Sequence, residues 1–345
     1  MFTVAEEELA DLRDRLRRTR WGRTWPGTDD SELRDLVAYW AGDFDWRARE
    51  AAINALPAHF ADVAGTRLHY LRYDGGTPDV LPIVLTHGWP SSILELTGLA
   101  ERLAAAGFTV IVPSLPGYAF SQVSDVQTHE LWHRLMTENL GFSRYAAHGG
   151  DLGAGVTARL GQAYPEAVVG IHVLAVADPP RYDPDTLTPD ERAHLDRQAS
   201  WLAEEGAYQH QQRKRPLTLS PGLADSPVGL LAWLLEKYRS WSDTPFTDDF
   251  VLTQTSLYWF TGTIATSFRP YYDHAQGRVT RIERVEVPTA VALFPKDLSH
   301  PPRSWAERTY HVERFTTMPR GGHFAAHEEP DLLAADIVAF FADKR

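Results

Sequence analysis

The residue best placed to do chemistry is Asp151, which stands among glycines in His148-Gly149-Gly150-Asp151-Leu152-Gly153. An apolar run precedes this segment and a helical pattern follows it, as in a nucleophile elbow with aspartate in the place of serine. The G-x-D-x-G string alone is more often an ordinary Asx turn, but its setting favours the elbow. The helix N-terminus would favour an ionised Asp151, and such a carboxylate attacks carbon and forms an ester with the enzyme.

A second acid and a histidine follow Asp151 in the chain order nucleophile, acid, histidine, which resembles that of α/β hydrolases. Of the fourteen histidines, His323 in Gly321-Gly322-His323-Phe324 is the one that follows a predicted strand and precedes a C-terminal helix. A lone histidine is usually structural or solvated, but this position favours a base that activates water. Asp297, at the tip of the penultimate strand, would orient the imidazole. Glu283 and Glu286 are interpreted as solvated charges.

The segment His87-Gly88-Trp89-Pro90 ends another predicted strand. In isolation it could equally be a simple strand-to-helix turn, but beside the elbow it can aim a backbone N–H at a developing oxyanion. We predict that the N–H groups of Trp89 and Leu152 form this oxyanion hole.

Apolar strand patterns alternate with helical ones along much of the chain, which predicts a mainly parallel sheet with right-handed crossovers. The pattern is interrupted by a Pro-, Gln-, Trp- and Tyr-rich stretch with helical patches. We predict an α/β fold of the α/β-hydrolase type, with helices on both sides of the sheet and four regions: an N-terminal helical arm (1–62), the first part of the core (63–179), a helical cap (180–275) and the second part of the core (276–345).

The charge and composition exclude several classes of function. A net charge of −12 disfavours a nucleic-acid or anionic-membrane surface. The basic run at 13–20 alternates with Leu9, Leu12 and Leu16, so we interpret it as the wet side of an amphipathic helix. The chain has no cysteine, which removes thiolate nucleophiles and Cys-based metal sites. With no apolar stretch of transmembrane length, we expect a soluble, cytoplasmic enzyme. The catalysis expected of Asp151, Asp297 and His323 needs no metal or organic cofactor.

Over nearly its whole length the sequence resembles the microsomal-type epoxide hydrolases, including their soluble bacterial members. The likeness in the N-terminal region lies in Leu16-Arg17-Arg18-Thr19-Arg20-Trp21, Tyr39-Trp40 and Phe44-Asp45-Trp46-Arg47. In the core it lies in His87-Gly88-Trp89-Pro90-Ser91-Ser92, Ser114-Leu115-Pro116-Gly117-Tyr118-Ala119-Phe120-Ser121, Gly149-Gly150-Asp151 and Gly321-Gly322-His323-Phe324.

The resemblance implies hydrolysis of an epoxide to a vicinal diol through an alkyl ester on Asp151. It also implies two cap tyrosines that hydrogen-bond the epoxide oxygen. Tyr208 matches the first, and Tyr271 or its neighbour Tyr272 matches the second. The sequence departs from the family at Leu152, where tryptophan is usual, which would change the shape of the pocket. The membrane-anchoring N-terminal helix of the microsomal enzyme is absent, which implies a soluble protein.

The aromatic-rich cap suggests a bulky substrate, apolar or aromatic, and the soluble bacterial relatives suggest a place in secondary metabolism. The oligomeric state is left open, with a homodimer as one candidate. A haloalkane or haloacid dehalogenase is the alternative enzyme, since it shares the aspartate nucleophile and the His–acid pair. The alternative outside catalysis is a ligand-binding relative that keeps the fold without turnover.

Overall fold

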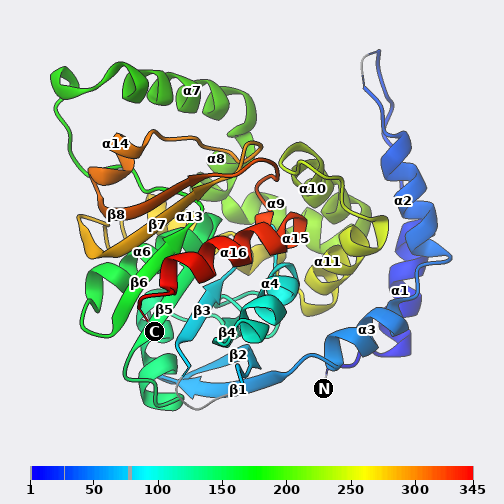
Figure 1. Cartoon of the computed structure of the whole chain (residues 1–345). Coiled ribbons are helices and arrows are strands. Elements are labelled where there is room, and N and C mark those ends of the chain that lie inside the picture. Colours follow the sequence, from blue (N-terminus) through cyan, green and yellow to red (C-terminus); the bar gives the residue numbers. More distant parts are fainter. Residues whose placement is uncertain (1, 27, 77–79, 345) are drawn as a thin grey trace.

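An eight-stranded sheet forms the centre of the computed structural model, which describes residues 2–26, 28–76 and 80–344 (Figure 1). Its spatial order is β1-β2-β4-β3-β5-β6-β7-β8. The pairs β1–β2 and β2–β4 are antiparallel, and all others are parallel. The strands are β1 Ala58–Val63, β2 Thr66–Tyr73, β3 Pro82–Thr86, β4 Thr109–Pro113, β5 Tyr145–Gly149, β6 Val168–Val173, β7 Val285–Leu293 and β8 Tyr310–Thr317.

Helices cover both faces of this sheet. On one face α4 (Ile93–Ala105) contacts α15 (Ala325–Glu328) and α16 (Pro330–Phe341), and on the other α5 (Thr128–Arg134) contacts α6 (Asp151–Ala163). A π-helical turn, η1 (Leu135–Asn139), continues α5. The predicted α/β-hydrolase fold is therefore confirmed.

The central strands are apolar because both of their faces are buried. In β3, the side chains of Ile83 and Leu85 pack with α4 and α16, whereas Val84 between them faces the core on the side of α6. This alternation follows from the two-residue period of a strand.

The strand positions agree with the sequence patterns except at two places. The sheet begins at β1, inside the segment predicted as helical. Five of the six residues of this edge strand are exposed or half-buried, so it lacks the apolar alternation that reveals a strand. Strand β7 begins at Val285, earlier than its apolar run suggests. Glu286 therefore lies on the strand, with its side chain exposed as expected of a solvated charge.

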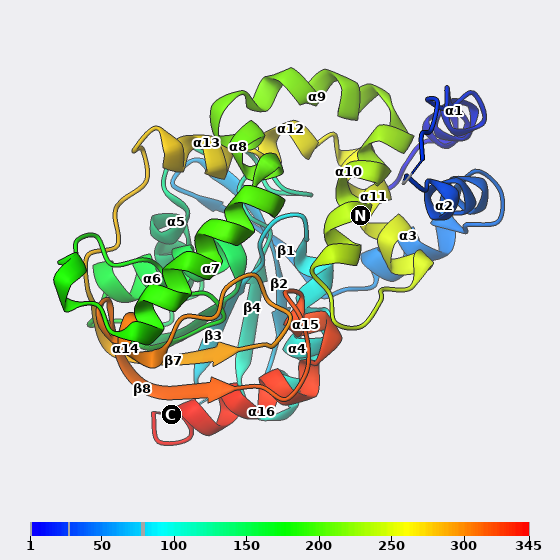
Figure 2. The ribbon, with the colours of Figure 1, turned by 90° about the horizontal axis from the view of Figure 1, so that it is seen from above.

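A group of helices separates β6 from β7 in the chain and lies over the ends of the parallel strands (Figure 2). The connection from β3 reaches this group through Trp89, whose ring packs against Tyr208 and Tyr271. The group comprises the 3-10 turn η2 Pro184–Thr186 and the helices α7 Pro189–Glu205, α8 Ala207–Lys214, α9 Pro216–Asp225, α10 Pro227–Ser240, α11 Asp248–Thr261, α12 Ile264–Ser267 and α13 Arg269–Ala275. The short α14 (Arg303–Glu307) lies between β7 and β8 in the chain.

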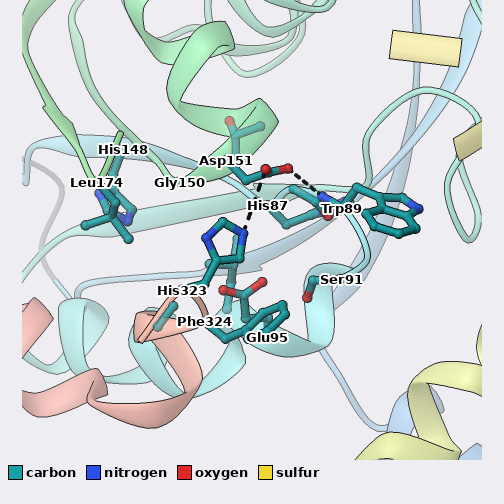
Figure 3. A pocket seen from close by; sticks show the side chains of 14 residues that line it. His87, Trp89, Ser91, Glu95, His148, Gly150, Asp151, Leu174, His323 and Phe324 are labelled. Carbon is teal, nitrogen blue, oxygen red and sulfur yellow. Dashed lines mark hydrogen bonds and ion pairs between the residues drawn. The ribbon is translucent and has the colours of Figure 1, made fainter. Parts of the chain in front are cut away.

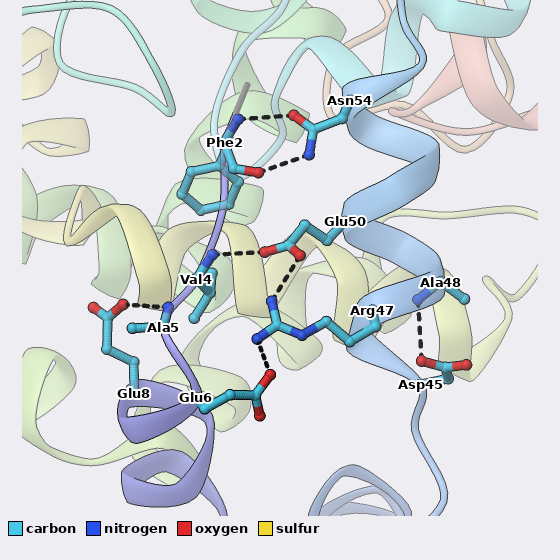
Figure 4. Close-up of polar contacts among 10 residues, drawn as sticks. All are labelled: Phe2, Val4, Ala5, Glu6, Glu8, Asp45, Arg47, Ala48, Glu50 and Asn54. Atoms are coloured by element: carbon cyan, nitrogen blue, oxygen red, sulfur yellow. Dashed lines mark hydrogen bonds and ion pairs between the residues drawn. The ribbon is translucent and has the colours of Figure 1, made fainter.

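The N-terminal helices α1 (Glu6–Arg17), α2 (Ser31–Ala41) and α3 (Trp46–Asn54) lie beside α10 and α11 (Figures 1 and 2). Leu9, Leu12 and Leu16 form the buried face of α1, which confirms the amphipathic helix. Figure 4 shows how α3 holds the first residues of the chain. The buried Glu50 carboxyl accepts a hydrogen bond from the Val4 N–H at 2.6 Å.

In the part of the chain that the structure describes, none of the helices combines the length and the apolar character needed to cross a membrane.

Candidate active site

Asp151 is the first residue of α6 and follows β5 after a single intervening glycine. Its φ of 47° lies in the left-handed region, where a residue with a side chain is strained and such strain often marks a functional site. Two glycines make the turn possible. A Cβ on Gly149 would lie 2.3 Å from the Gly153 carbonyl oxygen, and one on Gly153 would lie 2.1 Å from that of Thr86. The sharp elbow predicted around Asp151 is therefore present.

The Asp151 carboxyl is held from the side of the His87-Gly88-Trp89-Pro90 loop. The Trp89 backbone N–H donates to Oδ1 of Asp151 at 2.8 Å, and the Leu152 N–H is also hydrogen-bonded to this carboxyl. A Cβ on Gly88 would lie 2.4 Å from Asp151, so glycine allows the loop to come this close. The two N–H groups predicted as the oxyanion hole thus meet at one carboxylate.

His323 and Asp297 come to the same place from the far end of the chain. Nδ1 of His323 lies 2.7 Å from Oδ1 of Asp297, and Nε2 lies 3.8 Å from Oδ2 of Asp151. Asp297 follows β7, and His323 lies between β8 and α15. The Asp297 carboxylate accepts from Nδ1, so it sets the tautomer and turns Nε2 toward Asp151.

The charges of these groups support one another. Burial opposes a charged imidazole, but the carboxyls of Asp297, Asp151 and Glu95 together raise the pKa of His323 to about 9. Burial also raises the pKa of Asp151, against the opposing effects of His323 and the two N–H groups. Since both partners gain from the other's charge, the resting pair is a carboxylate beside an imidazolium.

The two cap tyrosines lie over this carboxylate, on α8 and α13. The Tyr208 ring stacks on Trp89 with 5.2 Å between centroids, and the Tyr271 ring meets Tyr208 edge-on at 6.2 Å. Burial and the charge of Asp151 raise both tyrosine pKa values, so the hydroxyls remain protonated donors at neutral pH. The Tyr271 hydroxyl lies beside that of Tyr208 and has no other polar partner among the described residues.

The neighbouring Tyr272 points elsewhere. It is half-buried, and its ring lies 5.3 Å from the guanidinium of Arg278. Of the two tyrosines left open by the sequence, Tyr271 is the one that borders the cavity next to Asp151.

Asp151 and His323 separate two cavities. The larger has a volume of about 670 Å³ and reaches Tyr271, Asp297 and the helices between β6 and β7. The smaller, of about 20 Å³, is bordered by Glu95 on α4 (Figure 3). Sequence reasoning missed Glu95. The available signal was an acidic residue within the apolar start of α4, one helical turn after Ser91.

A carboxylate on a strand-to-helix elbow, with a His–Asp couple and two backbone donors, defines an α/β hydrolase that works through an acidic nucleophile. Among the described residues, no cluster of His, Asp and Glu side chains is arranged to hold a metal ion.

Comparisons with known proteins agree with this class. Residues 1–96 match the family described as epoxide hydrolase N terminus, and residues 82–330 match the alpha/beta hydrolase fold. A Stigmatella aurantiaca protein provisionally named an epoxide hydrolase is 35% identical, over 100% of this chain and 84% of its own. Epoxide hydrolase 1 of Oryctolagus cuniculus is 32% identical, over 98% and 87%.

The solved structure of the Aspergillus niger epoxide hydrolase superposes with a TM-score of 0.90 at 30% identity, over 100% of this chain and 96% of that one. The chain belongs to the epoxide hydrolase family, as its sequence motifs predicted.

Proposed function

We propose that this epoxide hydrolase opens its substrate with Asp151 and releases the product with a water activated by His323. The observation that carries the proposal is the placement of one carboxylate. Its Oδ1 is held by the Trp89 N–H at 2.8 Å, while its Oδ2 lies 3.8 Å from the His323 imidazole. One oxygen is thus held for the oxyanion hole and the other lies next to the base.

In the first stage the Asp151 carboxylate attacks one epoxide carbon. The C–O bond of that carbon breaks, and its electron pair stays on the epoxide oxygen. Tyr208 and Tyr271 donate hydrogen bonds to this oxygen, and one of them gives up its proton. The Tyr271 hydroxyl supports this role, because among the described residues only the Tyr208 hydroxyl lies beside it, and a buried donor is costly unless a ligand satisfies it.

In the second stage the His323 imidazolium returns a proton to the tyrosinate and becomes a neutral base. A water molecule then adds to the carbonyl carbon of the ester and passes one proton to Nε2 of His323. The carbonyl electron pair moves onto the oxygen that faces the Trp89 and Leu152 N–H groups. Collapse of this intermediate expels the second hydroxyl of the diol, which takes the proton from the imidazolium. The proton left on Asp151 passes to Nε2 of His323, so the carboxylate and imidazolium of the resting enzyme are restored.

We propose a bulky substrate with an apolar or aromatic body. A cavity of about 670 Å³ is within the range of small-molecule sites, and its walls include Leu115, Val126, Leu152, Leu174 and Ile282. A role in secondary metabolism would fit such a substrate. The two tyrosine hydroxyls favour an epoxide oxygen over a halide as the group that leaves carbon, which disfavours a dehalogenase.

We also propose the division into an arm (1–62), a core in two parts (63–179 and 276–345) and a cap (180–275). Residues 1, 27, 77–79 and 345 of these ranges lie outside the described residues. The helices between β6 and β7, which lie over the strand ends, support the cap. The same proposal includes a cytoplasmic protein. The oligomeric state stays open, with a homodimer as one candidate, and light scattering of the purified protein would decide it.

Single turnover in water enriched in heavy oxygen tests the mechanism. Aryl, alkyl and polycyclic epoxides would first be screened, with chiral analysis of the diols, to find a substrate. Because water adds to the ester carbonyl, the label should appear in the Asp151 peptide by mass spectrometry and be absent from the first diol released. A first diol that carries the label would instead mean direct attack of water on the epoxide. Failure on every epoxide would contradict the proposed activity.

A further inference from the structure

The small cavity behind the nucleophile has walls that suit a single water molecule. Its volume of about 20 Å³ is close to what one water requires. Asp151, His323, Glu95 and Ser91 all border it (Figure 3). The larger cavity shares Asp151 and His323 with the small one but, among the described residues, has no wall from α4, so substrate and water can approach the same carboxyl from different directions.

Glu95 is the charged group in this wall that the mechanism above leaves unused. Among the described residues no arginine or lysine forms an ion pair with it. Burial raises the pKa of Glu95, and the nearby Ser91 hydroxyl, which lies 3.4 Å from the Ser92 carbonyl oxygen, opposes this rise. Neighbours on α4 such as Ile93 and Leu96 are buried apolar residues. A carboxyl in such surroundings is costly unless it has a compensating role.

An ordinary structural role for Glu95 would be helix capping, because Ser92-Ile93-Leu94-Glu95 has the sequence of a capping box. The structure does not use it in this way. The Ser92 hydroxyl accepts from the Leu94 N–H and donates to the side chain of Gln254. The Glu95 carboxyl instead contacts the Ser91 hydroxyl and lies next to the His323 ring (Figure 3).

His148, another polar residue that lines the cavity, already has a hydrogen-bond partner. Nδ1 of His148 lies 3.0 Å from Nδ1 of His172, whose Nε2 in turn meets the Asp336 carboxylate at 3.0 Å. Burial and the neighbouring His172 hold the pKa of His148 well below its ordinary value, so this ring is neutral. Glu95 is therefore the group in the wall that can add a charge-assisted hydrogen bond to a water.

We propose that Glu95, supported by the Ser91 hydroxyl, holds the hydrolytic water between His323 and the ester on Asp151. This inference rests on the two-stage mechanism proposed above. One proton of the water goes to Nε2 of His323 as its oxygen bonds to the ester carbon. The other proton stays on that oxygen and donates to the Glu95 carboxylate. With both protons held, a lone pair of the water oxygen is aimed at the ester carbon.

Glu95→Gln tests this role because it keeps the size of the side chain and removes its charge. Opening of the epoxide should stay within about twofold of wild type, whereas hydrolysis of the ester should slow by roughly tenfold or more, below the loss of about 10²–10⁴-fold typical of the base itself. Quenched-flow mixing and intact-protein mass spectrometry measure the two rates separately. Glu101→Gln, an exposed glutamate on the same helix, is the matched control and should hydrolyse the ester at the wild-type rate.

The pH dependence separates this role from a merely structural one. Burial raises the pKa of Glu95 to about 7, and above that pH its charge is one cause of the raised pKa of His323. The midpoint at which ester hydrolysis rises with pH should therefore move to lower pH in Glu95→Gln. The titratable groups around Glu95 are Asp151 on α6, His323 before α15, Glu328 on α15, Tyr238 and Tyr258 on α10 and α11, and His87 and His148 after β3 and on β5. They are unchanged in the variant, so a shift reports the loss of Glu95.

Ser91→Ala is a second variant, with a smaller slowing of hydrolysis expected, in case Glu95→Gln does not fold. Ester hydrolysis at the wild-type rate and an unchanged pH midpoint in a folded Glu95→Gln protein would overturn the role of Glu95. A slowing of epoxide opening as large as that of hydrolysis would also overturn it. If wild-type enzyme forms no ester at all, the proposed mechanism fails instead, and the two failures are thereby distinguished.

Discussion

Replacing His323 with glutamine should divide the reaction into its two stages. Burial raises the pKa of Asp151, but the His323 charge and two backbone N–H groups oppose this rise, and the resulting carboxylate needs no base to attack carbon. The water of the second stage needs one. His323→Gln should therefore form the alkyl ester and fail to hydrolyse it, whereas a serine hydrolase that loses its histidine is disabled in both steps.

The size of the effect follows from the surroundings of His323. Loss of a positioned general base costs about 10²–10⁴-fold, which corresponds to roughly 3–5 kcal/mol in the barrier. If opening and hydrolysis were equally fast in wild type, half of the saturated enzyme would be ester, and a hundredfold slower hydrolysis would raise this share to about 99%.

Alkylation of Asp151 also removes one of the charges that raise the pKa of His323 to about 9. The imidazole therefore becomes a readier proton acceptor once the ester has formed. Asp297→Asn removes the foremost of the raising charges, so it should lower the His323 pKa and clear the ester more slowly than wild type, but faster than His323→Gln.

Weighing the intact protein after mixing with substrate provides the assay. His323→Gln should gain the mass of one substrate molecule and keep it, and alkaline treatment should release the diol. His311→Gln, an exposed histidine on β8, is the control that should turn over normally. A His323→Gln protein that stays unmodified while wild type turns over would mean that His323 also serves the opening step, or that Asp151 is not the nucleophile.

Three further outcomes are expected. Tyr271→Phe should slow ester formation by up to about 10²–10⁴-fold, and by less if the remaining tyrosine donor preserves part of the rate. Tyr272→Phe should form the ester at close to the wild-type rate, and the reverse result in stopped-flow assays would reassign the donor. Gly153→Ala places a Cβ 2.1 Å from a carbonyl oxygen of β3, so it should lower the free energy of unfolding, measured by urea denaturation, by about 1–3 kcal/mol or more. In the control Gly155→Ala the new Cβ meets only the flexible end of an arginine at 3.0 Å, and stability should be unchanged. Asp336→Asn should lower the free energy of unfolding by about 3–5 kcal/mol. Burial alone would raise the pKa of Asp336, but hydrogen bonds from a histidine and an arginine lower it, so the loss of stability relative to wild type should be complete above about pH 5 and shrink as the pH falls through the lowered pKa. A loss of stability that grows toward acid pH would refute the assignment.

Much of the active centre could be predicted from local patterns. The turn at Asp151 needs small residues on both sides because backbone atoms of Thr86 and Gly153 approach within 3 Å of where a side chain would begin, so the chain signals it as a short string of glycines. His323 could be identified because chain order and its place after a strand set it apart from the other histidines. The parallel strands were visible because they are buried on both faces and therefore apolar throughout.

Other features depend on contacts between segments that are distant in the chain. Tyr271 and Tyr272 are adjacent and carry the same side chain, so residue type cannot distinguish them. The choice depends on which side of a short helix faces Asp151, which lies more than a hundred residues earlier in the chain. Glu95 stands where the local sequence predicts a helix-capping side chain. Its carboxyl instead borders a cavity because α4 packs against the elbow and the His323 loop. Strand β1 is exposed at the edge of the sheet and thus lacks an apolar pattern. Local sequence encodes backbone geometry and burial, whereas the side chains that meet around a reacting atom are decided when the sheet and its covering helices assemble.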